Sequence, residues 1–126
     1  MAEPNGNIIC VVDDDPSVLK AVVRLLSMAG RRVKEFSNPD EFLFYVETHG
    51  VAVAVLDVRM PRVTGLEVQS RLRDVSPSTR VIMFTAVNDS DVRSAALHAG
   101  ASAFLTKPLD GDQLLSAIDS ALASKK

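Results

Sequence analysis

The alternation of short apolar runs with helical patterns along the whole chain predicts an α/β fold, in which five βα units form a doubly wound parallel sheet. Three of the five apolar runs are nearly continuous in Val, Ile, Leu and Met, which is typical of strands that are buried on both faces. Parallel strands are joined by right-handed crossovers, so we expect helices on both faces of the sheet.

One of the five expected strands differs from the others in its charge. The run "VKEF" has two charged residues in its middle, whereas "IICVV", "VAVAVL" and "VIMF" have none. Charged side chains are best tolerated on an edge strand, so we expect "VKEF" at an edge of the sheet. The strands are expected at residues 8–12, 33–36, 51–56, 81–84 and 103–105.

The first expected helix, residues 16–29, has clear start and stop signals. Asp15 can cap its N-terminus, Pro16 suits its first turn, and Gly30 suits its C-terminal end. Apolar residues recur at the i, i+3, i+4, i+7 spacing of one buried face: Leu19, Val22, Val23 and Leu26.

The other helices are expected at residues 40–48, 65–75, 89–99 and 111–124. Asn38-Pro39 precedes the second helix, and Gly100 ends the fourth. The residues expected to face the core are Val68, Leu72 and Val75 in the third helix, Val92, Ala95, Ala96 and Ala99 in the fourth, and Leu115, Ile118 and Leu122 in the fifth.

Length and composition limit the class of protein. The chain has 126 residues, which suits a single domain over 1–126 in which residues 1–7 form an N-terminal tail. The net charge of −2 and the absence of Trp argue against direct nucleic-acid binding. Cys10 is the only cysteine and lies in an apolar run, which indicates a buried free thiol in a reducing compartment. We expect no signal peptide, no membrane span and a cytoplasmic location.

Polar residues follow four of the expected strands at one edge of the sheet. Asp13 and Asp14 follow the first strand in "CVVDDDPSVL", Asp57 follows the third in "VAVAVLDVRMP", and Thr85 and Lys107 follow the fourth and fifth. In open α/β sheets, ligands bind beyond the carboxyl ends of the strands. If the first and third strands are neighbours, three carboxylates meet in one pocket.

Taken singly, most of these residues have a structural explanation. Asp15 is best explained as a helix cap, a Thr after a strand often only turns the chain, and a Lys before Pro often lies in solvent. Asp57 is harder to explain, because an acid after six apolar residues is partly desolvated and needs a balancing group. The joint placement of the polar residues at four strand ends indicates a functional site.

The motifs "VVDDD", "DVRMP", "TG", "FTA" and "TKP", in this order and at this spacing, resemble the receiver domain of bacterial two-component response regulators. The resemblance covers essentially the whole chain. It implies a single receiver domain with the flavodoxin-like strand order 2-1-3-4-5. The segment "DVRMP" is similar to that of receivers attached to helix-turn-helix DNA-binding domains.

The resemblance also implies a metal site and a phosphorylation site. Asp14 and Asp57 would bind Mg²⁺ (or Mn²⁺) directly, Asp13 would bind it through water, and the backbone carbonyl of Arg59 would complete the protein ligands. Asp57 would accept a phosphoryl group from a sensor histidine kinase and form an acyl phosphate. Such a domain is not an enzyme in the usual sense, because it catalyses only its own phosphotransfer and dephosphorylation.

Further roles follow from the same resemblance. Lys107 would place a positive charge at the phosphoryl oxygens, Thr85 would donate its hydroxyl to them, and the small Ala86 would leave them space. Pro108 would follow a cis peptide bond that aims Lys107 into the pocket, and Gly65 would allow a tight chain path.

Signalling would depend on a pair of switch residues, Thr85 and Phe104. Their movement would change the face formed by the fourth helix, fifth strand and fifth helix, which would control a partner, an attached output domain or a phosphorylation-dependent homodimer. Arg59 and Val87 occupy the positions that tune phosphoryl lifetime among receivers.

Two other classes of protein fit part of the pattern. A phosphatase of the haloacid dehalogenase type would use Asp13 and Asp15, but Pro16-Ser17 does not match the residues expected next, and the chain leaves no room for a cap domain. A flavodoxin-like electron carrier would need a phosphate-binding loop after the first strand, where three acids would repel the flavin phosphate.

Overall fold

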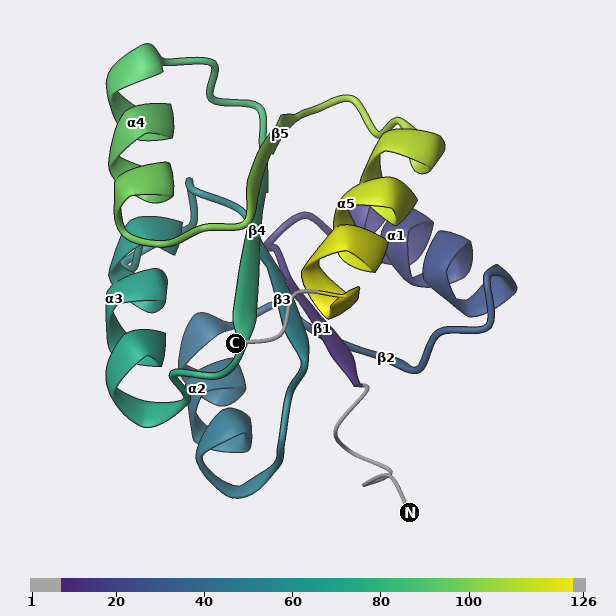
Figure 1. Cartoon of the computed structure of the whole chain (residues 1–126), viewed down its shortest axis with the longest axis horizontal. Coiled ribbons are helices and arrows are strands. Elements are labelled where there is room, and N and C mark those ends of the chain that lie inside the picture. Colours follow the sequence, from purple (N-terminus) through teal and green to yellow (C-terminus); the bar gives the residue numbers. More distant parts are fainter. Residues whose placement is uncertain (1–7, 124–126) are drawn as a thin grey trace.

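The computed structural model describes residues 8–123, in which five strands and five helices alternate along the chain (Figure 1). The strands are β1 (Ile9–Val12), β2 (Val33–Phe36), β3 (Val53–Leu56), β4 (Arg80–Thr85) and β5 (Ala103–Thr106). The helices are α1 (Pro16–Met28), α2 (Pro39–Thr48), α3 (Gly65–Val75), α4 (Ser90–His98) and α5 (Gly111–Ala123). The predicted elements are confirmed to within one or two residues, while the tail at 1–7 and residue 124 of the last predicted helix lie outside the described residues.

All five strands are parallel and form one sheet in the order β2-β1-β3-β4-β5, which confirms the predicted fold class. The charged strand β2 lies at an edge, as its sequence indicated. The register pairs Val12 of β1 with Leu56 of β3, so Asp13 and Asp57 follow neighbouring strands at the same level. This register brings the acids together before any side-chain contact is considered.

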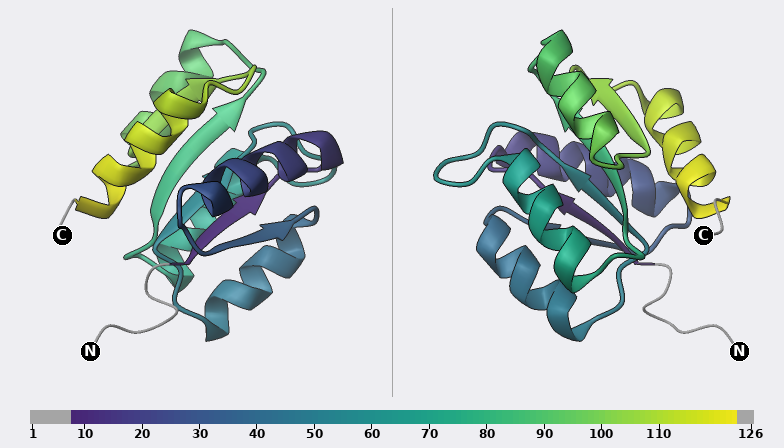
Figure 2. Two further views of the ribbon diagram at one scale, coloured as in Figure 1. Left: turned by 90° about the vertical axis from the view of Figure 1, so that its right-hand side faces the viewer. Right: turned by 60° about the vertical axis from the view of Figure 1, so that its left-hand side comes forward.

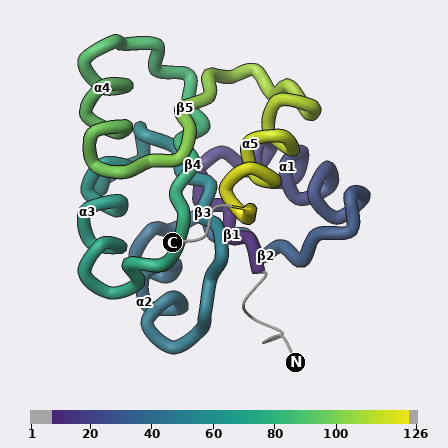
Figure 3. The backbone as a smooth tube through the Cα atoms, viewed as in Figure 1, coloured from purple at the N-terminus to yellow at the C-terminus, as the bar shows by residue number. Residues whose placement is uncertain are grey.

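The helices form two layers, one on each face of the sheet. Figures 1 and 3 show α1 and α5 on one side and α2, α3 and α4 on the other, and the two views of Figure 2 bring each layer forward in turn. The core is divided in the same way, because alternate strand residues point to opposite faces. No helix in residues 8–123 is long and apolar enough to cross a membrane.

The ends of α1 and α3 are fixed by local signals in the sequence. The Asp15 side chain accepts a hydrogen bond from the Ser17 amide, and Gly30 adopts a positive φ of 81° just beyond α1. At α3, Thr64 and Glu67 form a reciprocal capping box. The predicted cap, Pro16 and stop of α1 are therefore confirmed.

Some of the predicted inward faces are wrong. Val75, the last residue of α3, is 43% exposed. Ala95 of α4 is exposed, and Ala96 alone of that helix is fully buried in the described structure. In α5, Ile118 is buried as predicted. Leu114 and Ala121 are buried in place of the predicted Leu115 and Leu122, which are half-buried, because the apolar stripe is broad enough to allow either centre.

Candidate functional site

Three carboxylates meet at the carboxyl ends of β1 and β3, where the strand order reverses. Oxygen atoms of Asp13, Asp14 and Asp57 all lie within 4.8 Å of one another. Asp13 and Asp57 are almost completely buried, while Asp14 is exposed. The backbone holds them there, since the Asp57 amide donates to the Val12 carbonyl at 3.1 Å and the Asp15 amide donates to Asp13 Oδ1 at 2.9 Å.

Lys107, at the end of β5, bridges two of these carboxylates. Its Nζ lies 2.8 Å from Asp13 Oδ2 and 3.1 Å from Asp57 Oδ2. The Lys107 amide donates to the Thr85 carbonyl at 2.8 Å, and the peptide bond to Pro108 is cis, as the resemblance implied. The ends of β1, β3 and β5 thus place one ammonium and three carboxylates in a single pocket.

The charges in this pocket are unbalanced. Burial raises the pKa of Asp13, and the nearby Asp57 charge adds to that effect, while hydrogen bonds from Lys107 and the Asp15 amide oppose it. Burial acts to lower the pKa of Lys107, but its hydrogen bonds and attraction to Asp13 and Asp57 outweigh burial, so that pKa is raised. Lys107 therefore stays charged, and the carboxylates retain an excess of negative charge.

The residues present fit a hard divalent cation. The donor set consists of carboxylate oxygens, which Mg²⁺ prefers, and the surplus negative charge favours a cation beside Lys107. Receiver domains bind Mg²⁺ through an acidic pocket, and Asp13, Asp14 and Asp57 form a cluster that can hold such an ion. Asp15 lies outside the cluster, because its side chain caps α1.

Gly65 lies against the backbone of Asp57. Its amide donates to the Val58 carbonyl at 2.8 Å, and a Cβ atom built at Gly65 would overlap the Asp57 carbonyl oxygen. Gly65 is thus required by a close backbone approach. The Arg59 amide lies 3.3 Å from Asp57 Oδ1, so the segment after β3 curls around this carboxylate.

The remaining predicted site residues lie on the other side of Asp57, around β4 and β5. Thr85 is fully buried, and its Oγ1 accepts a hydrogen bond from the Val87 amide at 3.2 Å. Ala86 and Val87 line an open cavity of about 420 Å³ together with Arg59, Asn88 and Asp89. Phe104 is buried, with 6% of its surface exposed.

Sequence reasoning missed two residues that contact the elements around this site. The guanidinium of Arg93 lies over the ring of Phe104, 5.9 Å from its centroid. Gln69 of α3 is 2% exposed and bonds to the backbone of α4. An isolated Arg on a surface helix carries no sequence signal, whereas a Gln one position from the apolar stripe of α3 could have been noticed.

The model of the response regulator receiver domain family matches residues 9–119, and the chain therefore belongs to this family of signalling domains. Response regulator protein TmoT of Ectopseudomonas mendocina is 39% identical over 116 residues, which are 92% of this chain and 53% of TmoT. The DNA-binding transcriptional regulator NtrC of Salmonella typhimurium is 33% identical over 116 residues, which are 92% of this chain and 25% of NtrC. The chain thus spans about half the length of TmoT and a quarter of NtrC.

Solved structures agree with this assignment. A CheY-like receiver domain protein from Methanospirillum hungatei JF-1 superposes with a TM-score of 0.87 at 28% identity, over 92% of this chain and 93% of that one. The BeF3-activated receiver domain of DrrB, a Thermotoga maritima protein, gives a TM-score of 0.83 at 33% identity, over 93% and 97% of the two chains. Membership of the receiver family decides against the phosphatase and electron-carrier alternatives.

Proposed function

We propose that this chain is a phosphorylation-dependent switch in the cytoplasm, in which Asp57 accepts a phosphoryl group from a sensor histidine kinase in a Mg²⁺-dependent reaction. The observation that carries the proposal is the convergence of Asp13, Asp14, Asp57 and Lys107 at the carboxyl ends of three parallel strands. The domain over 1–126 acts on no substrate other than its own phosphoryl group.

In the transfer step, an oxygen of Asp57 forms a bond to phosphorus while the phosphorus–nitrogen bond of the donor breaks. The leaving imidazole of the kinase takes up a proton, so charge and atoms balance. Asp14, Asp57, the Arg59 carbonyl and, through water, Asp13 would hold Mg²⁺, which neutralises charge on the transferred group (Mn²⁺ would serve in the same way).

Lys107 and Thr85 stabilise the product. Lys107 keeps its contact with Asp13 and shifts from Asp57 Oδ2 to a phosphoryl oxygen. Thr85 Oγ1 already accepts from the Val87 amide, and its own hydrogen donates to a second phosphoryl oxygen. Ala86 is small and borders the open cavity, which leaves room for the phosphoryl group and its donor.

The signal leaves the site through Thr85 and Phe104. Movement of Thr85 toward the phosphoryl group changes the packing behind it, where Phe104 of β5 lies beside β4 and in the same core cluster as Ala96 of α4. The face of α4, β5 and α5 then controls a partner, an attached output domain or a homodimer. This domain itself does not bind nucleic acid, in keeping with its net charge of −2.

Intact-mass measurement tests the phosphorylation site. With a small acyl phosphate and Mg²⁺, the parent should gain one phosphoryl group, while Asp57→Asn should gain none. Asp112→Asn is the matched control, since Asp112 is an exposed acid in the first turn of α5, outside the acid cluster. Equal phosphorylation of Asp57→Asn and the parent would show that the assignment is wrong.

Calorimetric titration with Mg²⁺ tests the metal site independently. Asp14→Ala should weaken Mg²⁺ binding more than Asp15→Ala, because Asp14 lies in the carboxylate cluster and Asp15 caps α1. The reverse ranking would overturn the proposed ligand set.

A further inference from the structure

Helix α4 buries fewer residues than the other four helices of the described structure. Ala96 is its one fully buried residue in the described structure, and Val92 is half-buried against the same core. A helix normally relies on a broad apolar stripe to hold it on a sheet. The position of α4 must therefore depend strongly on its few polar contacts with neighbouring elements.

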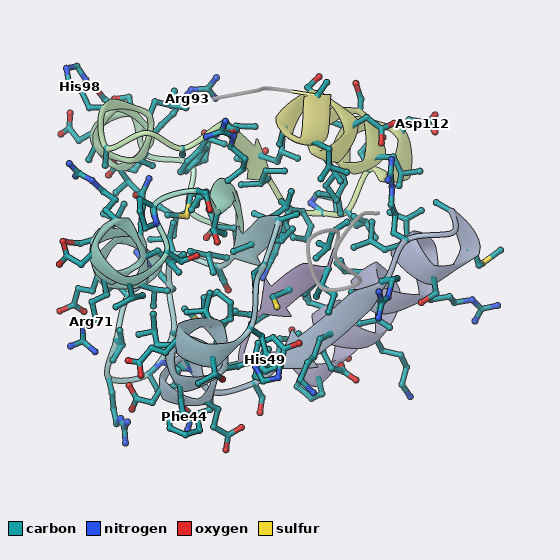
Figure 4. All side chains as sticks on the ribbon, turned by 60° about the horizontal axis from the view of Figure 1, so that its bottom comes forward. Phe44, His49, Arg71, Arg93, His98 and Asp112 are labelled. Atoms are coloured by element: carbon teal, nitrogen blue, oxygen red, sulfur yellow. The ribbon has the colours of Figure 1, made fainter. Side chains whose placement is uncertain are left out.

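One of these polar contacts is made by Gln69 of α3. Its side chain is 2% exposed, and its Nε2 donates to the Ala96 carbonyl at 3.0 Å. Arg71, two residues further along α3, points away from the sheet, as does His98 of α4 (Figure 4). Gln69 thus lies on the buried side of α3 and connects it directly to the backbone of α4.

The bond from Gln69 reaches the C-terminal end of α4, which is already closed by its own backbone. The Ala101 amide also donates to the Ala96 carbonyl, at 3.0 Å, and the Gly100 amide donates to the Leu97 carbonyl at 3.0 Å. This pair of bonds, with Gly100 at a φ of 105°, is a Schellman motif. The C-terminal end of α4 is therefore both rigid and anchored to α3.

The N-terminal end of α4 is held differently, because the half-buried Val92 packs against the core there. Asp89 caps it by accepting from the Asp91 and Val92 amides, but this cap is local to the helix. The N-terminal half of α4 also contacts β5 through the Arg93 side chain, which lies over the Phe104 ring. The open cavity of about 420 Å³ that Ala86, Val87, Asn88 and Asp89 line adjoins this end.

From this asymmetry we infer that Gln69 is a positioning residue that anchors α4 as a pivot, so that phosphorylation moves the N-terminal end of α4 about a fixed C-terminal end. The inference rests on the proposed function, since the movement starts from Thr85 when Asp57 carries a phosphoryl group. Arg93 would travel with the moving end and change its contact with Phe104, which links α4 to the second switch residue.

Residue-resolved amide hydrogen exchange, with and without beryllofluoride and Mg²⁺ as a phosphoryl mimic, tests the pivot. In the parent, beryllofluoride should change exchange at residues 90–95 and leave the amides of Ala99, Gly100 and Ala101 unchanged. In Gln69→Met, those three amides should exchange about three- to tenfold faster even without the mimic, as expected for one lost hydrogen bond. In this variant, addition of the mimic should then change the exchange rates of these three amides as well.

The chain offers a matched control in Gln113→Met, because Gln113 is exposed on α5. Gln69→Met should fold, because the Ala96 carbonyl keeps its hydrogen bond from the Ala101 amide. The measurements on the parent protein test the pivot even without this variant. Equal changes at both ends of α4 in the parent, or parent-like exchange in Gln69→Met, would overturn the pivot alone. No change around Asp57 on addition of the mimic would overturn the proposed function and the pivot with it.

Discussion

Helices α1 and α4 both follow a strand that ends in the site, yet they are held in opposite ways. Helix α1 has 13 residues and buries Leu19, Val22 and Leu26 against the sheet. Helix α4 has 9 residues, of which Ala96 is the one fully buried within the described structure. Each begins with an Asp cap, so the difference lies in the apolar face and not in the local start signals.

This difference in packing fits the part of the site that precedes each helix. Asp13, Asp14 and Asp15 lead directly into α1, so a firmly packed α1 keeps Asp13 and Asp14 of the carboxylate cluster in place. The segment Thr85–Asp89 leads into α4, so a loosely packed α4 can follow a movement of Thr85. On the proposed function, we expect the α1 side of the site to stay fixed and the α4 side to change its position at low energetic cost.

The largest effect is expected from truncating one leucine in each helix. Leu26 is completely buried, so Leu26→Ala should lower the free energy of unfolding by about 2–5 kcal/mol. Leu97 is 40% exposed, so Leu97→Ala should change it by about 0.5 kcal/mol or less. Urea denaturation followed by circular dichroism measures both. A similar loss for the two variants would remove the contrast between α1 and α4.

Removal of the two helix caps should give a smaller effect of the same kind. Asp15→Ala should cost about 0.5–2 kcal/mol in the free energy of global unfolding, because α1 unfolds with the core. Asp89→Ala should mainly accelerate amide exchange within α4, with a smaller change in the urea midpoint. Asp15→Asn and Asp89→Asn are the matched controls, since they keep a capping oxygen and remove the charge. A larger midpoint shift for Asp89→Ala would count against a loosely held α4.

The smallest effect is expected at Cys10, whose rate of labelling reports whether movement of α4 opens the core. Cys10 is fully buried in β1, and burial raises the pKa of its thiol to about 12. Thiol-reactive dyes at pH 8 should therefore label it at the rate of global unfolding, with or without beryllofluoride. Faster labelling with the mimic present would show that the switch opens the core as well as moving α4.

The same raised pKa of Cys10 gives a dependence of stability on pH. The unfolded thiol loses its proton near its ordinary pKa of about 8.5, while the folded thiol keeps it to about 12. The folded chain then binds more protons, so this group lowers the free energy of unfolding as the pH rises above about 9. Cys10→Ala should show a flatter pH dependence in that range.

The sheet and the acid cluster could be predicted because strong local signals fix them. Continuous apolar runs identified β1, β3 and β4, and the charges of "VKEF" placed β2 at an edge. The position of Asp57 after a buried strand, opposite Asp13 and Asp14, followed from the topology. The expected cis bond before Pro108 came from the family resemblance, because X-Pro bonds are mostly trans and the residues alone do not select the isomer.

Tertiary contacts between distant residues could not be predicted in the same way. The stripe of α5 offered two equally apolar centres, and the sheet selected Leu114 over Leu115. The bond from Gln69 to Ala96 joins residues 27 positions apart, through a side chain whose type also suits a solvent-exposed helix face. The bridge from Lys107 to both Asp13 and Asp57 depends on the ends of three strands lying within a few ångströms of one another.

A map of backbone amide chemical shifts with and without beryllofluoride and Mg²⁺ tests directly whether phosphorylation moves α4 and leaves α1 in place. We expect changes around Asp57 that continue through Thr85 into the N-terminal half of α4 and into β5, while Leu19–Met28 of α1 stay unchanged. The Lys107→Ala variant should still bind the mimic but show reduced changes in α4. Changes confined to the surroundings of Asp57, or changes in α1 as large as those in α4, would contradict this expectation.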